Sequence, residues 1–396
     1  MESVPWHQQL KAKRTAYGVS QNKLAVHAGI SRQYVSEIET GKANPTENLK
    51  HVLMDILEQW NPEAPLEILF DYARIRFLTT DPIPIIEDVL QLKMEYMIHE
   101  DHAMYSYMEQ YIYGEIVVMV SPEPDKGCLL EMKGQGCRQL ENFLLAQQRT
   151  WLDFWMTVLQ MGAVFKRIDI AINDKVNILD IPFLTEKCQR EECVSKFRRF
   201  KSYRSGELIR GEEKKDMGET LYIGSLKSDV NFCVYEKDYE QFVKYGTDMT
   251  DTDVKNRLEI RLKNDRAYHA ILDLMMYEDA GKTAFSIIQQ YFRFADTVVG
   301  KRRSSWPINA KWQRFLDLGE AHKIRLTTQP EPYTLAQTLR WLSHQVAPTW
   351  KLAMKIDELN HTTVLDDILK HAKLTDKHQK IIMQQTCSMN DIIKES

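Results

Sequence analysis

The sequence predicts an α+β fold in three parts, with helices at both ends of the chain and a sheet between them. Three observations support this prediction. Single glycines and capping residues divide residues 1–61 into short helices. Strand-like runs alternate with helical stretches over residues 66–266. Strand signals then fade over residues 267–396, where the spacing of apolar residues suits helices.

The composition excludes several classes of protein. The 396 residues are 43% hydrophobic and 27% charged, which is typical of globular domains rather than disordered chains. The formal net charge is −4, so a binding site for nucleic acid requires local clusters of basic residues. Six cysteines without CxxC pairs argue against a zinc ribbon or a disulfide framework. With no apolar segment of about 20 residues and no signal-like N-terminus, we expect a cytoplasmic protein without membrane insertion.

Residues 20–46 have the pattern of two short helices joined by a tight turn. Ser20 can cap the first helix, Gly29 supplies the turn, and Ser31 can cap the second helix. The first turn of that second helix would expose side chains able to reach base edges and phosphates in a major groove, namely Arg32, Gln33 and Tyr34.

This segment resembles the Cro/CI-type helix-turn-helix. The matching positions are Gln21, Leu24, Ala25, Gly29, Ser31, Val35, Ile38, Glu39 and Gly41. The resemblance implies that residues 1–61 bind duplex DNA and that the contacts include Gln21, Ser31, Arg32, Gln33 and Tyr34. The alternative is a helical bundle that binds a protein partner.

A Pro-rich break at residues 61–65 separates this part from the next and is the candidate linker. We predict strands at 68–77, 110–121, 127–133, 164–172, 219–224, 230–236 and 255–263, and helices at 82–94 and 138–160. In the C-terminal region, the predicted helices lie within 267–298, 307–319, 334–357 and 361–394.

Period-two alternation places the polar residues of four strands on one face of the predicted sheet. If the strands are neighbours, Glu131, Asp169, Glu259 and Tyr235 can converge. Carboxylates without histidine or thiolate suit a hard divalent ion such as Mn²⁺ or Mg²⁺. A tyrosine beside such an ion can attack a phosphodiester, and Lys237 can add positive charge there. The alternative is that these charged residues are solvated or paired across strands.

The segment GETLYIGSLKSDVNFCVYEKDYEQ, residues 218–241, resembles the signature of the Rep_trans family of rolling-circle replication initiators. The strands RIDIAIND and NRLEIRLKND are also similar to family segments. The resemblance implies an antiparallel-sheet nicking domain at 66–266, followed by a mostly helical region at 267–396. It also implies that Tyr235 is the nucleophile rather than Tyr222 or Tyr239, that Lys237 is the basic residue following it, and that the metal ligands are Asp169, Glu259 and, by a weaker motif, Glu131.

Within this family, a preceding helix-turn-helix is typical of the MobT relaxases of integrative conjugative elements, such as Gram-positive tetracycline-resistance transposons. This resemblance implies a DNA endonuclease and strand transferase that nicks a transfer origin through a 5′-phosphotyrosine. It initiates transfer, or rolling-circle replication, together with a helicase and a conjugative coupling protein. Two alternatives stay open: a plasmid-type initiator with the same chemistry, and a transcriptional regulator in which Tyr235 and the carboxylates are dispensable.

The chain departs from the family at two positions. Cys233 and Leu226 stand where the family often has arginines, so phosphate contacts are expected from other basic residues. The candidates are Lys227, the run KFRRFKSYR with Lys196, Arg198 and Arg199, and the segment GKRRSSW with Lys301, Arg302 and Arg303. The run KFRRFKSYR can also be a solvated basic strand or loop, and GKRRSSW can also be an exposed loop. The chain has no His-hydrophobic-His triplet, so we expect Mn²⁺ or Mg²⁺ rather than zinc.

Overall fold

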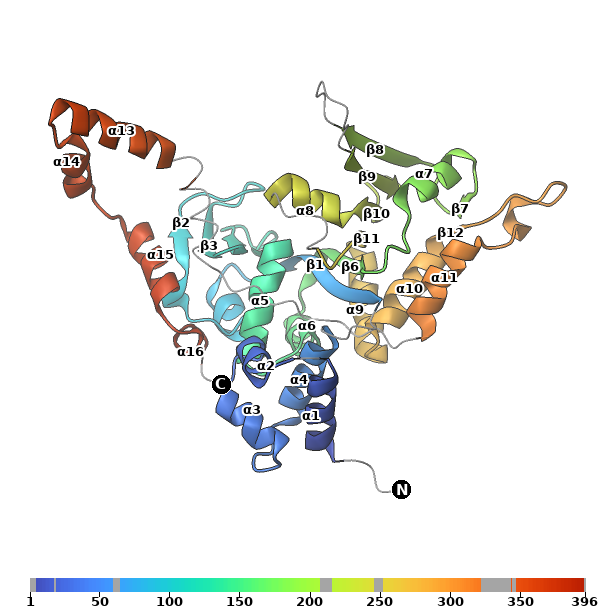
Figure 1. Cartoon of the computed structure of the whole chain (residues 1–396), viewed down its shortest axis with the longest axis horizontal. Helices are drawn as coiled ribbons and strands as arrows, with labels where there is room; N and C mark the ends of the chain where they lie inside the picture. The colour runs from blue at the N-terminus through green and yellow to red at the C-terminus, as the bar shows by residue number, and fades with distance from the viewer. Residues whose placement is uncertain are drawn as a thin grey trace.

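A ten-stranded sheet forms the centre of the computed structural model, which describes residues 5–17, 19–59, 65–206, 216–245, 252–321, 343 and 347–394 (Figure 1). The strand order is β2-β3-β4-β5-β1-β6-β11-β10-β9-β8, and every neighbouring pair is antiparallel. Its strands are β1 (Leu66–Phe77), β2 (Ile98–Glu100), β3 (Glu109–Tyr113), β4 (Ile116–Val120), β5 (Cys128–Lys133), β6 (Val164–Asp174), β8 (Phe200–Gly206), β9 (Asp216–Ile223), β10 (Val230–Glu236) and β11 (Asn256–Lys263).

A second sheet pairs β7 (Cys193–Ser195) with β12 (Phe292–Phe294). The helices preceding or interleaved with the main sheet are α1 (Trp6–Ala16), α2 (Gln21–His27), α3 (Arg32–Glu39), α4 (Glu47–Gln59), α5 (Gly134–Ala146), α6 (Trp151–Gln160), α7 (Ile181–Gln189) and α8 (Lys237–Tyr245). Those after it are α9 (Asp265–Tyr277), α10 (Ala280–Tyr291), α11 (Ala310–Ala321), α13 (Ala347–Asn360), α14 (Val364–His371), α15 (Asp376–Thr386) and α16 (Met389–Ile392).

The N-terminal helices pack around a small apolar core of their own, as the sequence predicts. Gly29 has a φ of +62°, which a glycine adopts without strain, and it forms the turn between α2 and α3. Ser31 caps α3, because its Oγ accepts a 3.0 Å hydrogen bond from the backbone N–H of Tyr34. Val35 and Ile38 are fully buried against the other helices. The turn and the second helix therefore form as expected.

This helical unit rests on the end of α5. Leu145 of α5 belongs to the apolar cluster of the N-terminal helices. The hydroxyl of Thr46 also donates a 3.1 Å hydrogen bond to the side chain of Gln148. Of the proposed linker at 61–65, residues 61–64 lie outside the described part of the chain.

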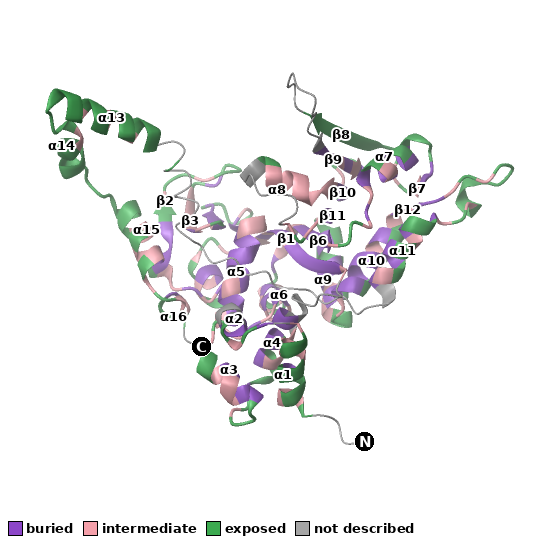
Figure 2. Ribbon diagram, in the orientation of Figure 1, coloured by how far each residue is buried: buried purple, intermediate pink, exposed green. Residues whose placement is uncertain are grey.

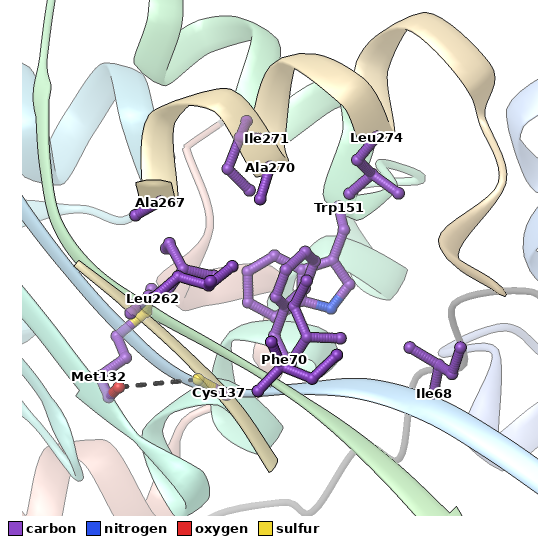
Figure 3. Packing of buried hydrophobic residues seen from close by; sticks show 14 of the residues in the cluster. Ile68, Phe70, Met132, Cys137, Trp151, Leu262, Ala267, Ala270, Ile271 and Leu274 are labelled. Carbon is purple, nitrogen blue, oxygen red and sulfur yellow. Dashed lines mark hydrogen bonds between the residues drawn. The ribbon is translucent and has the colours of Figure 1, made fainter. Parts of the chain in front are cut away.

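Helices α5, α6 and α9 cover the apolar face of the central sheet. Figure 3 shows Ala270, Ile271 and Leu274 of α9 above the rings of Phe70 and Trp151. In β6, the alternation predicted from the sequence is confirmed, since Ile168, Ile170 and Ile172 are buried in this core. The opposite face carries the polar residues.

Several predicted elements differ in the structure. The run 110–121 is not one strand but the hairpin β3–β4, which turns at Gly114 with a φ of +55°. The predicted helix 138–160 is two helices, because Thr150 starts α6 through a capping box with Asp153. The predicted helix 82–94 is reduced to a π-helical turn at Ile85–Val89 and a short 3₁₀ turn. Strands β2, β7, β8 and β12 were missed.

The described residues of the C-terminal region share the core of the sheet. Residues of α9, α10 and α11, with Trp312 among the largest, belong to the same buried cluster as the strands, so the predicted boundary at 266/267 divides one core. Helices α13 and α14 project from the body with most residues exposed (Figure 2). The chain then returns through α15 and α16, where the N–H of Lys394 donates to the carbonyl of Gln91. Of the predicted helix at 334–357, residues 334–342 and 344–346 lie outside the described residues.

Among the described residues, no helix combines the length and the apolar character needed to cross a bilayer.

Candidate active site

The four strands with aligned polar residues, β5, β6, β11 and β10, lie close together in the sheet, with β1 between β5 and β6. Directly opposed residues of antiparallel strands point to the same face, so the register shows which polar side chains meet. Asp169 of β6 is opposite Arg261 of β11, and Glu259 is opposite Cys233 of β10. Tyr235 lies further along β10, opposite Arg257. The polar residues therefore share one face, as the alternation predicts.

Tyr235 contacts one of the predicted metal ligands directly. Its hydroxyl donates a 2.9 Å hydrogen bond to Oε1 of Glu259. Burial raises the pKa of Tyr235 well above its usual value, and the charge of Glu259 raises it further. The phenol is therefore protonated at neutral pH, and the group that accepts its hydrogen bond is a carboxylate.

Arg261 holds the other side of Glu259 and approaches a second carboxylate. Its Nε and Nη2 lie 3.0 and 2.7 Å from Oε2 of Glu259. The same Nε is 3.9 Å from Oδ2 of Asp169. Arg167 makes two hydrogen bonds to Asp169, of 2.9 and 2.6 Å. Burial nevertheless raises the pKa of Asp169 to about 6, with Arg167 opposing the shift. Asp169 and Glu259 thus share one arginine between adjacent strands.

Glu131 lies on the same face but apart from the other two carboxylates, because β1 separates β5 from β6. Three side chains converge on its Oε1. Arg74 donates to it from Nε at 2.9 Å and from Nη2 at 2.6 Å, the hydroxyl of Tyr72 donates to it, and the hydroxyl of Tyr105 lies 3.2 Å away. The structure therefore does not bring Glu131 together with Asp169 and Glu259.

The side chains of this face offer some of the donors that a divalent ion needs. Among the described residues, no three side chains of Asp, Glu, His or Cys are grouped so as to hold a metal. Asp169 and Glu259 supply hard oxygen donors from adjacent strands. Asn231 lies opposite Arg261, and its side-chain oxygen is buried without a hydrogen-bond partner. Two carboxylates and an amide oxygen fit a hard ion, provided that the arginines release the carboxylates.

Lys237 is the first residue of α8, directly after β10. Its ammonium lies 5.6 Å from the centre of the Tyr235 ring and pairs with Glu240. Burial, with the nearby charge of Arg257, lowers the pKa of Lys237. Helix α8 comes close to β9 at Gly218, which has a φ of +86°. A Cβ atom there would lie 2.7 Å from Cβ of Tyr239, so only glycine fits this position.

The two other candidate tyrosines are placed differently. Tyr222 of β9 lies on the same face, in register with Cys233, and its ring is 5.6 Å from the guanidinium of Arg261. Tyr239 lies in α8 and packs against Gly218. Of the three, Tyr235 donates a hydrogen bond to Glu259.

Three arginines of this face were not among the predicted site residues. Arg167 and Arg261 hold the carboxylates, and Arg257 donates to Asn173 at 2.7 Å and to Asp71 at 2.9 Å beside Tyr235. Their alternation with Ile168 and Leu258 already placed them on the polar face. The prediction assigned roles to the carboxylates, to Tyr235 and to Lys237 but none to these arginines, although guanidinium groups are well suited to bind phosphate.

The predicted duplex-binding residues divide into two groups. Arg32 and Gln33 are exposed on the first turn of α3, and Tyr34 is half-buried. Gln21 instead donates to the buried carboxylate of Glu39, and Ser31 caps α3. These two residues therefore also maintain the helical unit.

The basic run before β9 also has two roles. Lys196, Arg198 and Arg199 are exposed, whereas Phe197 stacks on Tyr291 with ring centres 5.4 Å apart. Phe197 is therefore packed and not free to stack on a base. Exposed aromatic rings occur further on in β8, at Phe200 and Tyr203.

The remaining basic candidates lie away from Tyr235. Lys227 is in the turn before β10, at the opposite end of that strand from Tyr235. Lys301 and Arg302 are exposed on a projecting loop, while Arg303 donates to the carbonyl oxygen of Cys193. Arg303 therefore has a structural contact.

Comparison with known protein families was consistent with this geometry. Residues 163–369 match the Rep_trans family, described as replication initiation factor, and residues 67–157 match the rolling circle replication initiation protein N-terminal domain. Residues 10–49 match a helix-turn-helix family. The chain belongs to the Rep_trans family.

The family assignment is supported by a relative from Bacillus subtilis (strain 168), named "Putative DNA relaxase NicK". It is 37% identical over 332 residues, which cover 84% of this chain and 93% of the relative. The fold is similar to that of a rolling circle replication initiator protein from Geobacillus stearothermophilus. That comparison has a TM-score of 0.57 and 23% identity, and it covers 67% of this chain and 99% of that structure. The predicted family and fold class are therefore confirmed.

Proposed function

We propose that this Rep_trans protein is a DNA relaxase that cuts one strand at a transfer origin and keeps one end as a covalent adduct. The observation that carries the proposal is the hydrogen bond from Tyr235 to Glu259 on a sheet face that also holds Asp169, Lys237 and Arg257. The family membership and the NicK relative support a nicking activity.

The reaction begins at the hydroxyl of Tyr235. Its proton passes to Oε1 of Glu259, and the phenolic oxygen attacks the scissile phosphorus. The bond between phosphorus and the 3′ oxygen breaks, and that oxygen takes up a proton to become a free 3′ hydroxyl. The 5′ phosphate stays on Tyr235. Since one phosphoester replaces another, the strand can later be rejoined without ATP.

The cations beside Tyr235 bind and orient the phosphate. Arg257 is buried and held in place by Asn173 and Asp71, so its guanidinium is preorganised. Lys237 adds a second positive charge over the phenol ring. Asp169 and Glu259 would hold Mn²⁺ or Mg²⁺, together with the amide oxygen of Asn231 on the same face of the sheet. When bound, such an ion polarises the phosphoryl group and neutralises developing charge.

The helix-turn-helix favours transfer over plasmid replication. Arg32 and Gln33 are exposed for duplex contacts while the sheet acts on a single strand, so the protein can recognise flanking duplex next to the strand that it cuts. We propose that a helicase and a conjugative coupling protein act with it. A plasmid-type initiator would use the same chemistry.

The test is adduct formation. Purified protein is incubated with labelled single-stranded oligonucleotides tiling the DNA beside its gene, with Mn²⁺ or Mg²⁺, and resolved on a denaturing gel. We expect an adduct that chelator prevents and that Tyr235→Phe does not form, whereas Tyr222→Phe does. If no oligonucleotide gives an adduct while sequence-specific duplex binding remains, the protein is a regulator and the proposal fails.

A further inference from the structure

A cluster of aromatic and basic side chains lies beside the candidate site and has no role in the reaction described above. It consists of Tyr72 and Arg74 of β1, Tyr105 of the loop between β2 and β3, and Glu131 of β5. Its polar atoms meet at one point, since Nη2 of Arg74 donates to the hydroxyls of Tyr72 and Tyr105, at 2.5 and 2.6 Å, and to Glu131. The cluster is therefore a built, ordered arrangement.

Tyr105 presents an exposed ring from a strained loop. Its side chain is 43% exposed, and the guanidinium of Arg74 lies 4.4 Å from its ring centre. Tyr105 and Ser106 have φ values of +56° and +59°, in the left-handed region that favours glycine and is strained for other residues. The loop is fastened by Lys126, whose ammonium donates to the carbonyl of Ser106 at 2.6 Å. The fold therefore maintains an unfavourable backbone that leaves this ring partly exposed beside Arg74.

The charge around the cluster suits a nucleic acid backbone. Arg74 lies directly opposite Arg167, and both guanidinium groups lie over the Tyr72 ring, at 5.5 and 4.2 Å from its centre. Lys133 lies 3.9 Å from Glu131. Arg74 and Lys133 thus flank the buried carboxylate of Glu131, and Arg167 adds a third cation across the Tyr72 ring, beside the partly exposed ring of Tyr105. Proteins bind unpaired strands with this combination, in which rings stack on bases and cations contact phosphates.

The cluster is connected to Tyr235 by a continuous diagonal line of contacts across the sheet. Its members in order are Tyr235, Glu259, Arg261, Asp169, Arg167, Tyr72, Arg74 and Tyr105. The backbones of Tyr235 and Arg74 are three strands apart across the sheet, at about 4.8 Å per strand, and six residues apart along the strands, at about 3.3 Å per residue. The distance between the two backbones is therefore roughly 25 Å. That distance corresponds to several nucleotides of an extended strand.

We propose that Tyr105 and Arg74 form a subsite for one unpaired nucleotide of the strand that Tyr235 cuts, several nucleotides from the scissile phosphate. The base stacks on the exposed face of Tyr105, and Arg74 and Arg167 contact the backbone. Glu131 is a positioning residue that fixes Arg74 and both tyrosines. The inference rests on the proposed function, because it assumes that the sheet face receives a single strand.

Binding is measured without chemistry, in the Tyr235→Phe background with chelator present, by fluorescence anisotropy of a labelled oligonucleotide spanning the mapped nick site. We expect Tyr105→Ala to weaken binding by about tenfold, since stacking contributes roughly 1–3 kcal/mol per base, and Tyr105→Phe to retain most of it. Tyr277→Ala removes a ring of similar exposure elsewhere and should change nothing. Glu131→Gln should also weaken binding, which a residue acting only through a metal would not do in chelator.

The position of the stacked base is tested with oligonucleotides that lack one base each. Removing the base at one position, several nucleotides from the nick, should weaken binding to the protein that retains Tyr105. The same removal should not weaken binding to the Tyr105→Ala variant. Unchanged binding in Tyr105→Ala, or equal losses at every position, would overturn the subsite. If the parent forms the adduct and Tyr105→Ala binds normally, the subsite alone is wrong. If the parent neither forms an adduct nor binds any single strand, both proposals fail.

Discussion

The phenol of Tyr235 on β10 donates a 2.9 Å hydrogen bond to Glu259 on the neighbouring strand β11. This contact joins the predicted nucleophile to a carboxylate that can take its proton. Arg261 fixes the other oxygen of Glu259, so the accepting oxygen is held towards Tyr235. The arrangement connects the nucleophile with the pair of carboxylates shared by Arg261.

Replacing Glu259 should affect chemistry far more than binding. In Glu259→Gln the amide cannot accept a proton from Tyr235, and we expect adduct formation to slow by about 10²- to 10⁴-fold. Binding of a single strand in chelator should stay close to that of the parent. Pre-steady-state adduct formation on denaturing gels measures the first quantity and anisotropy the second. A Glu259→Gln protein that forms the adduct at the parental rate would remove Glu259 from the mechanism.

The three carboxylates that were predicted to bind metal should not contribute equally to metal affinity. Asp169 shares Arg261 with Glu259, so we expect Asp169→Asn to weaken Mn²⁺ binding by about tenfold or more. Glu131 is held instead by side chains of β1, so we expect Glu131→Gln to leave Mn²⁺ binding nearly unchanged. Titration of Mn²⁺ followed by electron paramagnetic resonance measures both. Equal losses in the two variants would mean that Glu131 reaches the ion.

Gly218 should be intolerant of a side chain. A Cβ there would lie 2.7 Å from Cβ of Tyr239, and its φ of +86° disfavours other residues. We expect Gly218→Ala to destabilise the protein by about 1–3 kcal/mol and to reduce adduct formation, because α8 carries Lys237. Gly206→Ala, where the added carbon meets open space, is the matched control. Denaturant unfolding compares the two, and equal stability would argue against the close contact of α8 with β9.

Acid should remove a specific stabilising contact of Glu192. Its carboxylate lies 2.8 Å from the ammonium of Lys187 and accepts from Thr297, and Lys187 is the main cause that lowers its pKa to about 2. A lowered pKa means that this carboxylate stabilises the fold above its unfolded value near 4.5 and loses that effect as pH falls towards 2. Over that window, the parent should lose more stability than Glu192→Gln. Identical slopes of unfolding free energy against pH would contradict this.

The helix-turn-helix should act on duplex DNA independently of the sheet. Arg32→Ala or Gln33→Ala removes an exposed side chain of α3, and we expect duplex binding to weaken by about tenfold if it contacts a base, with single-strand binding unchanged. Ser31→Ala should instead destabilise the helical unit by about 1 kcal/mol through loss of the cap. Gel-shift and thermal unfolding distinguish these effects. Loss of single-strand binding in Arg32→Ala would contradict the separation.

The sequence predicted which side chains share one face of the sheet better than it predicted which of them contact one another. Alternation placed Tyr235, Glu259 and Asp169 on one side because a strand has a period of two, and the family motif selected Tyr235 among three tyrosines. Alternation contains no strand order, so it could not show that β1 lies between Glu131 and Asp169. Roles were predicted for the carboxylates, for Tyr235 and for Lys237 but not for the arginines that hold the carboxylates.

Short elements defined by tertiary contacts were the main errors in the fold. Strand β12 is three residues within a run of helical spacing, and it forms because it pairs with β7, far away in the sequence. Tyr105 could not be recognised from the sequence, because its exposed ring depends on two left-handed residues and on Arg74 from another strand.

The most direct test of the central claim is identification of the residue that carries DNA. The adduct formed with Mn²⁺ or Mg²⁺ is digested with protease and nuclease, and the nucleotide-linked peptide is sequenced by mass spectrometry. We predict a 5′-linked nucleotide on Tyr235. A nucleotide on Tyr222, Tyr239 or any other residue would contradict the assignment of the nucleophile and the role given to Glu259.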